Sequence, residues 1–270
     1  GTTATVHQHN DAPAKPPTTY YRRSPTAAGR PYSTDNIAAH AQLTLQADAY
    51  TLVSVPFLKF PHYQGTVSTS TSSAITDTNA TWTPGQFAPG VAGQEAAGTS
   101  TFSVEIRESL HAQGGRRFAI TANTATELTI DGGLQAGLTN DALDGVAYAI
   151  VAEQRMRDIF GGPGAPVLNG GGSVLNADNI LFWSGGSWER IYYKDSGNPP
   201  YLRNHWLLGS TVLDDRVVPA NAGIFVQRRA PSNTVLHVVG EVPRLDQWID
   251  LNVGFNLIGG GWTDSPAILD

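Results

Sequence analysis

Apolar and polar residues alternate along most of this chain with a period of two, which predicts β-strands rather than helices. Strands of this kind are expected at residues 101–106, 118–130, 179–183, 188–193, 223–229 and 234–242. Only residues 153–160 show a helical spacing of apolar positions, and Gly161-Gly162 ends it. The pattern therefore predicts a mainly β fold of antiparallel barrel or sandwich domains, with one short helix and an extended N-terminal arm.

Residues 37–60 mark the change from arm to folded body. Leu43 and Leu45, then Tyr50 and Leu52, alternate with polar residues, and residues 53 and 55 add valines on the other parity. Apolar side chains on both parities predict a strand that is buried on both faces. Prolines at 56 and 61 are expected to end it.

Turn signals and composition divide the chain into three expected parts. Residues 1–40 form an extended N-terminal arm, and residues 41–62 together with 152–270 form a β-sandwich-like domain. Residues 63–151 contain Thr/Ser-rich strands separated by Gly and Pro turns, and we expect them to form a small inserted domain like an antiparallel β-barrel.

The arm is polar, rich in Pro and Thr, and basic. Residues 1–34 hold four basic residues and Asp11, a net charge of +3, and the remaining residues hold 13 basic and 22 acidic groups, a net charge of −9. One interpretation is a solvated tail, since such a composition buries too little apolar surface to order itself. The other is that the arm docks on a neighbouring copy, because complementary potentials steer association and set register.

No common catalytic motif is present, because the sequence has no G-x-S-x-G, H-E-x-x-H, G-x-x-x-x-G-K-[ST] or G-x-G-x-x-G. We therefore expect that this chain is not an enzyme. Only three of the 17 basic residues are lysines and the net charge is −6, which argues against nucleic acid as a partner. The uncharged run at 159–177 contains six glycines and two prolines, so no membrane span is predicted.

No cofactor is predicted either. The chain has no cysteine, and its seven histidines are scattered, with His7 and His9 as a close pair in the arm. Four turn residues are the weak candidates for calcium: Asp141, Asp144, Asp214 and Asp215. Neither pair resembles a twelve-residue calcium loop, and solvated turn acids are the preferred interpretation.

Four aromatic residues cluster around the turn at 184–187: Trp183, Trp188, Tyr192 and Tyr193. On an exposed face such rings stack on sugars or anchor a partner, and in a core they fill volume. Core filling is the commoner fate. Alternation places Tyr192 and Tyr193 on opposite faces, so we expect at least one of them to be accessible.

Several of these segments together resemble a little-characterised family of exported, β-rich bacterial proteins, found in Verrucomicrobia and their relatives. The segments that carry the resemblance are residues 50–57, 82–87, 115–118, 123–126, 176–183 and 223–229. They are structural strands and turns. The resemblance implies export and a β architecture, and it carries over no catalytic residue.

The function expected from these observations is a structural subunit of an extracellular homopolymer, as a filament, a tube or a surface layer. Gly1 opens the chain and its one Met is Met156, which fits removal of a signal peptide, although a trimmed chain would begin in the same way. The arm, or the strand at 41–47, would complete a neighbour's sheet by strand addition. The candidate contact residues are Tyr20, Tyr21, Ile37, Leu43 and Leu45. The alternative is a secreted or cell-surface module that binds polysaccharide through Trp183, Trp188, Tyr192 and Tyr193.

Overall fold

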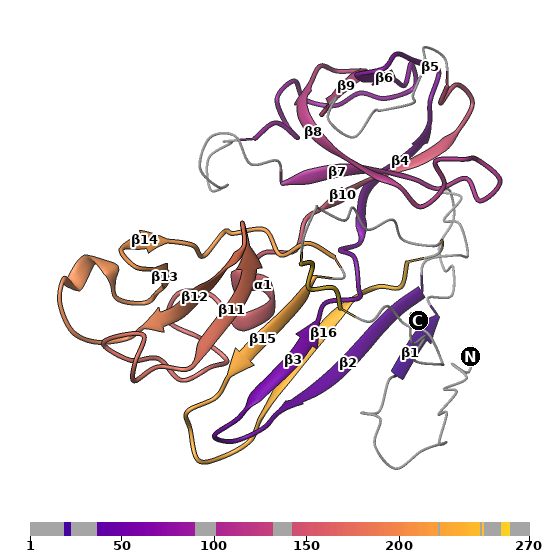
Figure 1. Ribbon diagram of the computed structural model, residues 1–270. Coiled ribbons are helices and arrows are strands. Elements are labelled where there is room, and N and C mark those ends of the chain that lie inside the picture. The colour runs from indigo at the N-terminus through magenta and orange to yellow at the C-terminus, as the bar shows by residue number, and fades with distance from the viewer. Residues whose placement is uncertain are drawn as a thin grey trace, which may run out of the picture. The chain divides into compact units, whose positions relative to one another are not determined.

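The computed structural model describes residues 19–22, 37–89, 101–131, 142–220, 222–243, 245 and 255–259, with the backbone alone at 19–22 and 37. Strands make up most of the regular structure in these residues, and every pairing between named strands is antiparallel (Figure 1). The one α-helix among them is α1 (Met156–Phe160). The prediction of a mainly β, antiparallel fold with one short helix is confirmed.

The described residues divide into two compact units. The first contains residues 19–22, 37–57, 154–220, 222–242 and 255–259. The second contains residues 58–89, 101–131, 142–153, 243 and 245. Each unit has its own hydrophobic core. The aromatic residues singled out in the sequence lie in the first unit.

The first unit contains two sheets. The three-stranded sheet has the order β1-β2-β16, and the six-stranded sheet has the order β14-β13-β12-β11-β15-β3. The strands of the first are β1 (Thr19–Arg22), β2 (Ile37–Leu45) and β16 (Thr234–Glu241). Those of the second are β3 (Tyr50–Ser54), β11 (Asn179–Ser184), β12 (Ser187–Lys194), β13 (His205–Leu208), β14 (Thr211–Val212) and β15 (Gly223–Gln227). A 3₁₀ turn, η2 (Pro200–Leu202), precedes β13.

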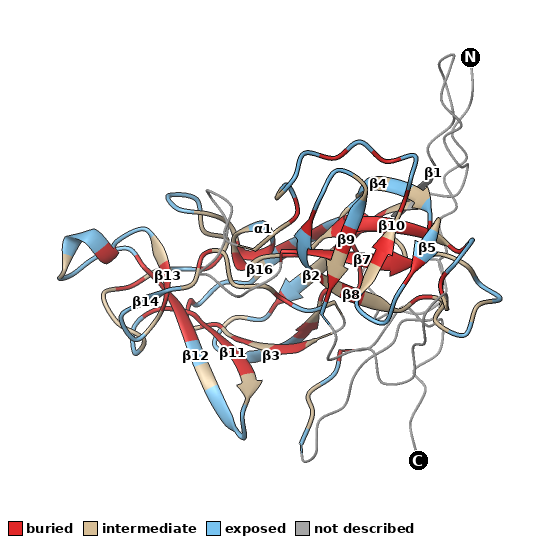
Figure 2. Cartoon of the chain, turned by 90° about the horizontal axis from the view of Figure 1, so that it is seen from above, coloured by how far each residue is buried: buried red, intermediate tan, exposed pale blue. Residues whose placement is uncertain are grey.

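The second unit contains one seven-stranded sheet of order β4-β10-β7-β8-β9-β6-β5. Its strands are β4 (Pro61–Thr66), β5 (Thr69–Ser70), β6 (Ala74–Thr76), β7 (Phe102–Ile106), β8 (Arg117–Asn123), β9 (Glu127–Ile130) and β10 (Ala147–Ala152). Every residue of β7 is buried, and so are the central residues of β10, which makes these two strands the middle of the core (Figure 2).

A buried carboxylate organises the second unit. Asp77 accepts hydrogen bonds from the hydroxyls of Tyr63 (3.0 Å) and Tyr148 (2.9 Å), and its other oxygen accepts the backbone N–H of Asn79 (2.9 Å). Burial, and then the hydrogen bond to Asp77, raise the pKa of Tyr63 to about 12 and raise the pKa of Tyr148 as well. Both phenols therefore stay protonated donors at neutral pH.

The helix is shorter than the sequence predicts, because its first residues pair elsewhere. The N–H of Glu153 donates to Thr101, and Arg155 forms an antiparallel bridge with Val217. Extended pairing thus holds residues 153–155, and α1 begins at Met156. The apolar side of α1, formed by Met156, Ile159 and Phe160, is buried in the core of the first unit.

The sequence predicts one strand buried on both faces at residues 37–60, and this prediction is wrong. A turn at 46–49 separates β2, in the three-stranded sheet, from β3, in the six-stranded sheet. The valines at 53 and 55 enter the core, whereas Tyr50 and Leu52 are exposed. β3 is an edge strand of a sheet with one covered face, so only one of its two sets of side chains is buried.

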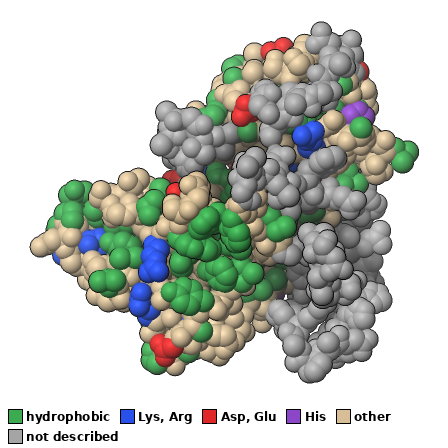
Figure 3. Space-filling view, viewed as in Figure 1, with side chains coloured by type: hydrophobic (Ala, Val, Ile, Leu, Met, Phe, Trp, Pro, Cys, Tyr) green, Lys and Arg blue, Asp and Glu red, His purple; other side chains and the backbone are tan. Residues whose placement is uncertain are grey.

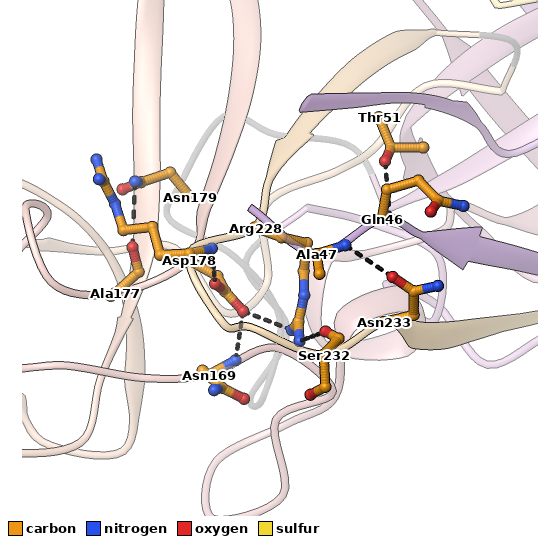
Figure 4. A network of polar contacts seen from close by, with 11 residues as sticks. Gln46, Ala47, Thr51, Asn169, Ala177, Asp178, Asn179, Arg228, Ser232 and Asn233 are labelled. Atoms are coloured by element: carbon orange, nitrogen blue, oxygen red, sulfur yellow. Dashed lines mark hydrogen bonds and ion pairs between the residues drawn. The ribbon is translucent and has the colours of Figure 1, made fainter. Parts of the chain in front are cut away.

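A polar network fixes the ends of β11 and β15 beside the turn that leads to β16 (Figure 4). Asp178, just before β11, accepts hydrogen bonds from the guanidinium of Arg228 (2.6 Å), the N–H of Arg229 (2.7 Å) and the N–H of Asn169 (2.8 Å). The other arm of the Arg228 guanidinium donates to the carbonyl of Ser232 (3.0 Å). The side chains of Asp178 and Arg228 are 0% and 1% exposed. This buried ion pair ties the segment at 169–178 to the segment at 228–232, which is distant in sequence.

Candidate functional site

The outer face of the six-stranded sheet carries an apolar surface that the core does not use. Strand alternation sends Ile180, Phe182, Ile224 and Val226 into the core, and their neighbours therefore point outward. Six residues form this surface, which we call the aromatic face: Tyr50 and Leu52 of β3, Trp183 of β11, Trp188 of β12, Phe225 of β15, and Phe255.

Register and ring contacts join these residues into one surface. Leu52 lies directly opposite Phe225 in the ladder, and Trp183 lies opposite Trp188. Trp188 contacts both Trp183 (centroids 5.1 Å apart) and Phe225 (5.7 Å). Trp183 also contacts Phe255 (5.1 Å), and its indole N–H donates to the Phe255 carbonyl (2.9 Å). These contacts make the face continuous from β3 to β12.

The rings meet edge to face. The interplanar angles are 70° for Trp183 with Trp188, 77° for Trp183 with Phe255, and 64° for Trp188 with Phe225. Such contacts are the favoured geometry for aromatic pairs. The rings are therefore steeply inclined to one another and do not form one flat platform.

Much of this surface is open. Tyr50 is 53% exposed, Leu52 51%, Trp188 41% and Phe255 61%. Figure 3 shows hydrophobic side chains gathered over the six-stranded sheet, with basic side chains along one border. Large contiguous apolar patches are uncommon on free monomers, and the largest patch of a monomer is often functional. The aromatic face is therefore the candidate functional site.

The short C-terminal segment at 255–259 lies along one border of the face. The N–H of Gly223 donates to the carbonyl of Leu257 (3.1 Å), and Ile258 bridges to Ala222. Gly259 lies so close to Ser54 that a Cβ added there would come within 2.1 Å of the Ser54 Cβ. Only glycine fits at this approach, which keeps Phe255 in place beside Trp183.

Of the four aromatic residues singled out in the sequence, two lie on the aromatic face. Trp183 and Trp188 belong to it, whereas Tyr192 and Tyr193 are both buried. The expectation that at least one tyrosine is accessible is wrong, because β12 is exposed only at its Ser187 end and passes into the interior toward Lys194 (Figure 2). Tyr193 packs on Trp206 in the main core, and Tyr192 packs in a smaller cluster with Leu202 and Leu207.

Sequence reasoning missed the other four members of the aromatic face. The sequence pattern predicts burial of Tyr50 and Leu52, and it does not mark Phe225 or Phe255 as site residues. The alternation of Tyr50 and Leu52 with polar residues indicates a strand with one exposed face. It does not indicate which of the two sets of side chains is exposed. Phe255 joins the face only through tertiary contacts.

The candidate self-assembly residues lie in or beside the three-stranded sheet. β1 pairs with β2 in the register Tyr20↔Ala39, Tyr21↔Ala38 and Arg22↔Ile37. On its other side β2 pairs with β16 from Ala38 to Leu45. Leu45 is fully buried in the core of its own unit, and Leu43 is partly buried against the same core. Their part in contacts between copies stays a prediction.

The calcium candidates that the structure describes already have donors around them. Asp144 accepts from the hydroxyl of Ser70 (2.9 Å), and Asp215 forms ion pairs with Arg155 and Arg157. Asp214 contacts the ring of His205 (2.5 Å) and accepts the N–H of Trp206 (2.8 Å). His7, His9 and Asp141 lie outside the described residues. Within the described ranges, no group of three or more His, Asp or Glu is arranged to hold a metal ion.

No helix in the part of the chain that the structure describes has the length and apolar character needed to cross a membrane. Comparison of the chain with protein-family models, with curated proteins and with solved structures gives no match. The resemblance to the exported bacterial family therefore stays a prediction, and the function is argued from the geometry alone.

Proposed function

We propose that this chain is the structural subunit of an extracellular homopolymer, a filament, tube or layer, in which β1 of one copy adds to β2 of the next. The observation that carries the proposal is the β1–β2 ladder. A four-residue strand, remote from the body in sequence, pairs with the edge of β2, so this edge accepts an N-terminal strand. The same register can be formed by β1 of another copy. The proposed role is structural rather than catalytic.

The free length of the edge supports this proposal. Among the described residues, the side of β2 that faces β1 has ladder partners only at 37–40, whereas β16 pairs with β2 as far as Leu45. An edge with unpaired N–H and C=O groups is a template for another chain. Strand addition gives affinity through main-chain hydrogen bonds, so it does not need a large side-chain interface.

The connection between the two strands is long enough for exchange between copies. Fourteen residues, 23–36, separate β1 from β2. A chain of this length spans up to about 45 Å when extended. Because exchange replaces one ladder with an identical one, the ladder alone does not favour the polymer. The β1 strand of the same subunit competes for β2 with an effective concentration of about millimolar. Assembly therefore needs either a subunit concentration in that range or a further contact between copies.

Cysteine cross-linking tests this proposal directly, because the chain has no cysteine of its own. Tyr21 lies opposite Ala38 in the ladder, so Tyr21→Cys and Ala38→Cys place two thiols within disulfide reach. One preparation carries Tyr21→Cys and a second carries Ala38→Cys. Oxidation of the mixture should give a disulfide-linked heterodimer on a non-reducing gel, and either preparation alone should not give that product.

A matched pair of variants and electron microscopy complete this test. Tyr21→Cys mixed with Gln42→Cys is the out-of-register control, because Gln42 faces no residue of β1 in the ladder. Negative-stain images of the full chain should show ordered polymers, and a chain that begins at Ile37 should remain monomeric. Truncation at 37 keeps Ala39 and Ala41, which are core residues. Polymers formed by the truncated chain, or no cross-link within polymers of the full chain, would refute the proposal.

A polysaccharide-binding module is the second candidate, favoured by the exposure of Trp188 and Phe255. Sugar rings stack on open aromatic faces and receive hydrogen bonds from nearby polar groups. Here the rings cover one another edge to face, and the Trp183 N–H already donates to Phe255. Both features make the aromatic face less suited to stacking on a sugar than to contacting a protein segment. Retention of any glycan that Trp188→Ala abolishes would revive this candidate.

A further inference from the structure

We propose that the aromatic face binds the Pro-rich segment at residues 12–17 of a neighbouring copy, the copy whose β1 is added to the same subunit. This inference rests on the proposed function and names its second contact. A second contact is needed because exchange of β1 between copies replaces one ladder with an equal one. The aromatic face supplies an exposed apolar surface in the same unit as β2, with Tyr50, Leu52, Trp188 and Phe255 each more than 40% exposed.

The sequence of residues 12–17, Ala-Pro-Ala-Lys-Pro-Pro, matches this kind of surface. Its prolines are spaced as P-x-x-P, which favours the polyproline II conformation. A polyproline II segment has no internal hydrogen bonds and little conformational freedom to lose on binding, and it docks in furrows between aromatic rings. Trp183, Trp188 and Phe225 supply adjoining aromatic rings, inclined to one another, of the type that lines such docking sites.

The hydrogen-bonding groups of the face suit the same occupant. Polyproline II segments present backbone carbonyls, which need donors. The indole N–H of Trp183 is used by the Phe255 carbonyl. That of Trp188 has no acceptor among the described residues, and the residue is 41% exposed. Trp188 is therefore positioned both to pack against a proline ring and to donate to a carbonyl beside it.

The ladder explains how the segment reaches the face. β1 begins at Thr19, and the residues before it include Pro16 and Pro17, which have no N–H for a ladder. In the proposed contact these residues therefore leave the ladder and do not extend the pairing along β2. β2 contacts β3, and β3 is the edge strand of the six-stranded sheet and carries Tyr50 and Leu52. A strand added to β2 thus delivers the residues before it to the border of the aromatic face.

The lengths also agree. From β3 to β12 the face crosses three strand spacings, about 14 Å. Six residues in polyproline II span about 19 Å. Residues 12–17 are therefore long enough to cross the face from Leu52 to Trp188. The net charge of +3 on residues 1–34, against −9 on the remainder of the chain, favours encounter of arm and body in general, and the apolar contact selects this face.

A peptide experiment separates this contact from strand addition. The probe is a fluorescein-labelled synthetic peptide of residues 7–18, which lacks β1. The receptor is the full chain with Pro13, Pro16 and Pro17 replaced by Ala, so that its own segment does not compete. We expect saturable binding by fluorescence anisotropy. When the receptor also carries Trp188→Ala, the affinity for the peptide should fall by about tenfold or more.

Two further receptor variants keep the result interpretable. Leu52→Ser changes a second exposed residue of the face and should weaken binding in the same direction. Val239→Ser is the matched control, because Val239 is also more than half exposed but lies on β16 of the three-stranded sheet, and binding should not change. No saturable binding, or equal binding to all three variants, overturns the inference.

A mixing experiment tests whether the occupant comes from a second copy. The Trp188→Ala chain keeps its segment and the triple Pro→Ala chain keeps its face. Each alone should sediment as a monomer, and an equimolar mixture should form heterodimers in sedimentation velocity. Peptide binding without heterodimers would mean that each segment covers its own face, which overturns the intermolecular contact. Peptide binding with no polymer of the unmodified chain would refute strand addition and leave the docking site standing.

Discussion

Breaking the buried ion pair between Asp178 and Arg228 should destabilise the first unit selectively. Asp178→Ala takes away the only carboxylate that the structure shows paired with Arg228, and both side chains are almost fully buried. Breaking a buried pair by removing one partner costs about 3–5 kcal/mol, because the remaining charge stays buried without compensation. The N–H groups of Asn169 and Arg229 also lose their acceptor, at about 1–3 kcal/mol each where they stay unsatisfied.

The expected loss is therefore at least about 4 kcal/mol, a large fraction of the roughly 5–15 kcal/mol that stabilises an ordinary domain. With a urea dependence of about 2 kcal/mol per molar, the unfolding midpoint of the first unit should fall by about 2 M. Because the chain has two units, unfolding is not a single two-state transition. Hydrogen exchange measured by mass spectrometry, peptide by peptide, reports each unit separately. Peptides from β11 and β15 should lose protection, and peptides from β7 and β10 should keep it.

Two controls make the magnitude decisive. Glu189→Ala removes the partner of Arg216, an ion pair whose side chains are 28% and 23% exposed, and should cost at most about 1 kcal/mol. Asp178→Leu combined with Arg228→Met removes both charges and should recover part of the loss, but not all of it, since the two N–H groups remain without an acceptor. The reasoning is refuted if Asp178→Ala costs no more than Glu189→Ala.

Three further predictions concern the two cores. Gly65→Ala should destabilise the second unit alone, because the added Cβ would lie 2.3 Å from the Asp77 carboxylate and 2.8 Å from the Tyr63 ring; calorimetry or hydrogen exchange checks this. Alkaline pH should destabilise the same unit: the pKa of Tyr63 rises from 10.0 to about 12 on folding, so its contribution is complete below pH 10 and is lost as pH rises through about 12. Leu45→Ala should cost the first unit about 2–5 kcal/mol in urea unfolding, against about 0.5 kcal/mol or less for Val239→Ala, because Leu45 is fully buried and Val239 is largely exposed.

Each of these has a specific contrary result. Equal losses in both units for Gly65→Ala would mean that its effect is not local to Asp77. A Tyr148→Phe, Tyr63→Phe double variant that keeps the full alkaline loss of stability would show that other groups cause it. Similar midpoints for Leu45→Ala and Val239→Ala would contradict the placement of β2 in the core.

The candidate site was only partly predictable from the residues themselves. Trp183 and Trp188 stand out because aromatic residues gather around a short turn. Tyr192 and Tyr193 belong to the same sequence cluster, yet both are buried, because β12 passes from the surface into the core along its length. Leu52 and Phe225 meet across two strands that are more than 150 positions apart, and local sequence carries no signal for that pairing.

The sequence alone determined the mainly β character of the described residues, their antiparallel strands and the short helix that follows residue 155, because alternation and turn residues act over a few neighbouring positions. It also determined that the first residues are basic and rich in proline. Only the tertiary structure decided where a strand faces inward. The split of β2 from β3, the exposure of Tyr50 and Leu52, the burial of Asp178 with Arg228 and the position of Phe255 all depend on contacts between distant segments. The physical reason is that side chains of a strand alternate between two faces with a period of two residues. Which face is buried depends on what the rest of the chain packs against it.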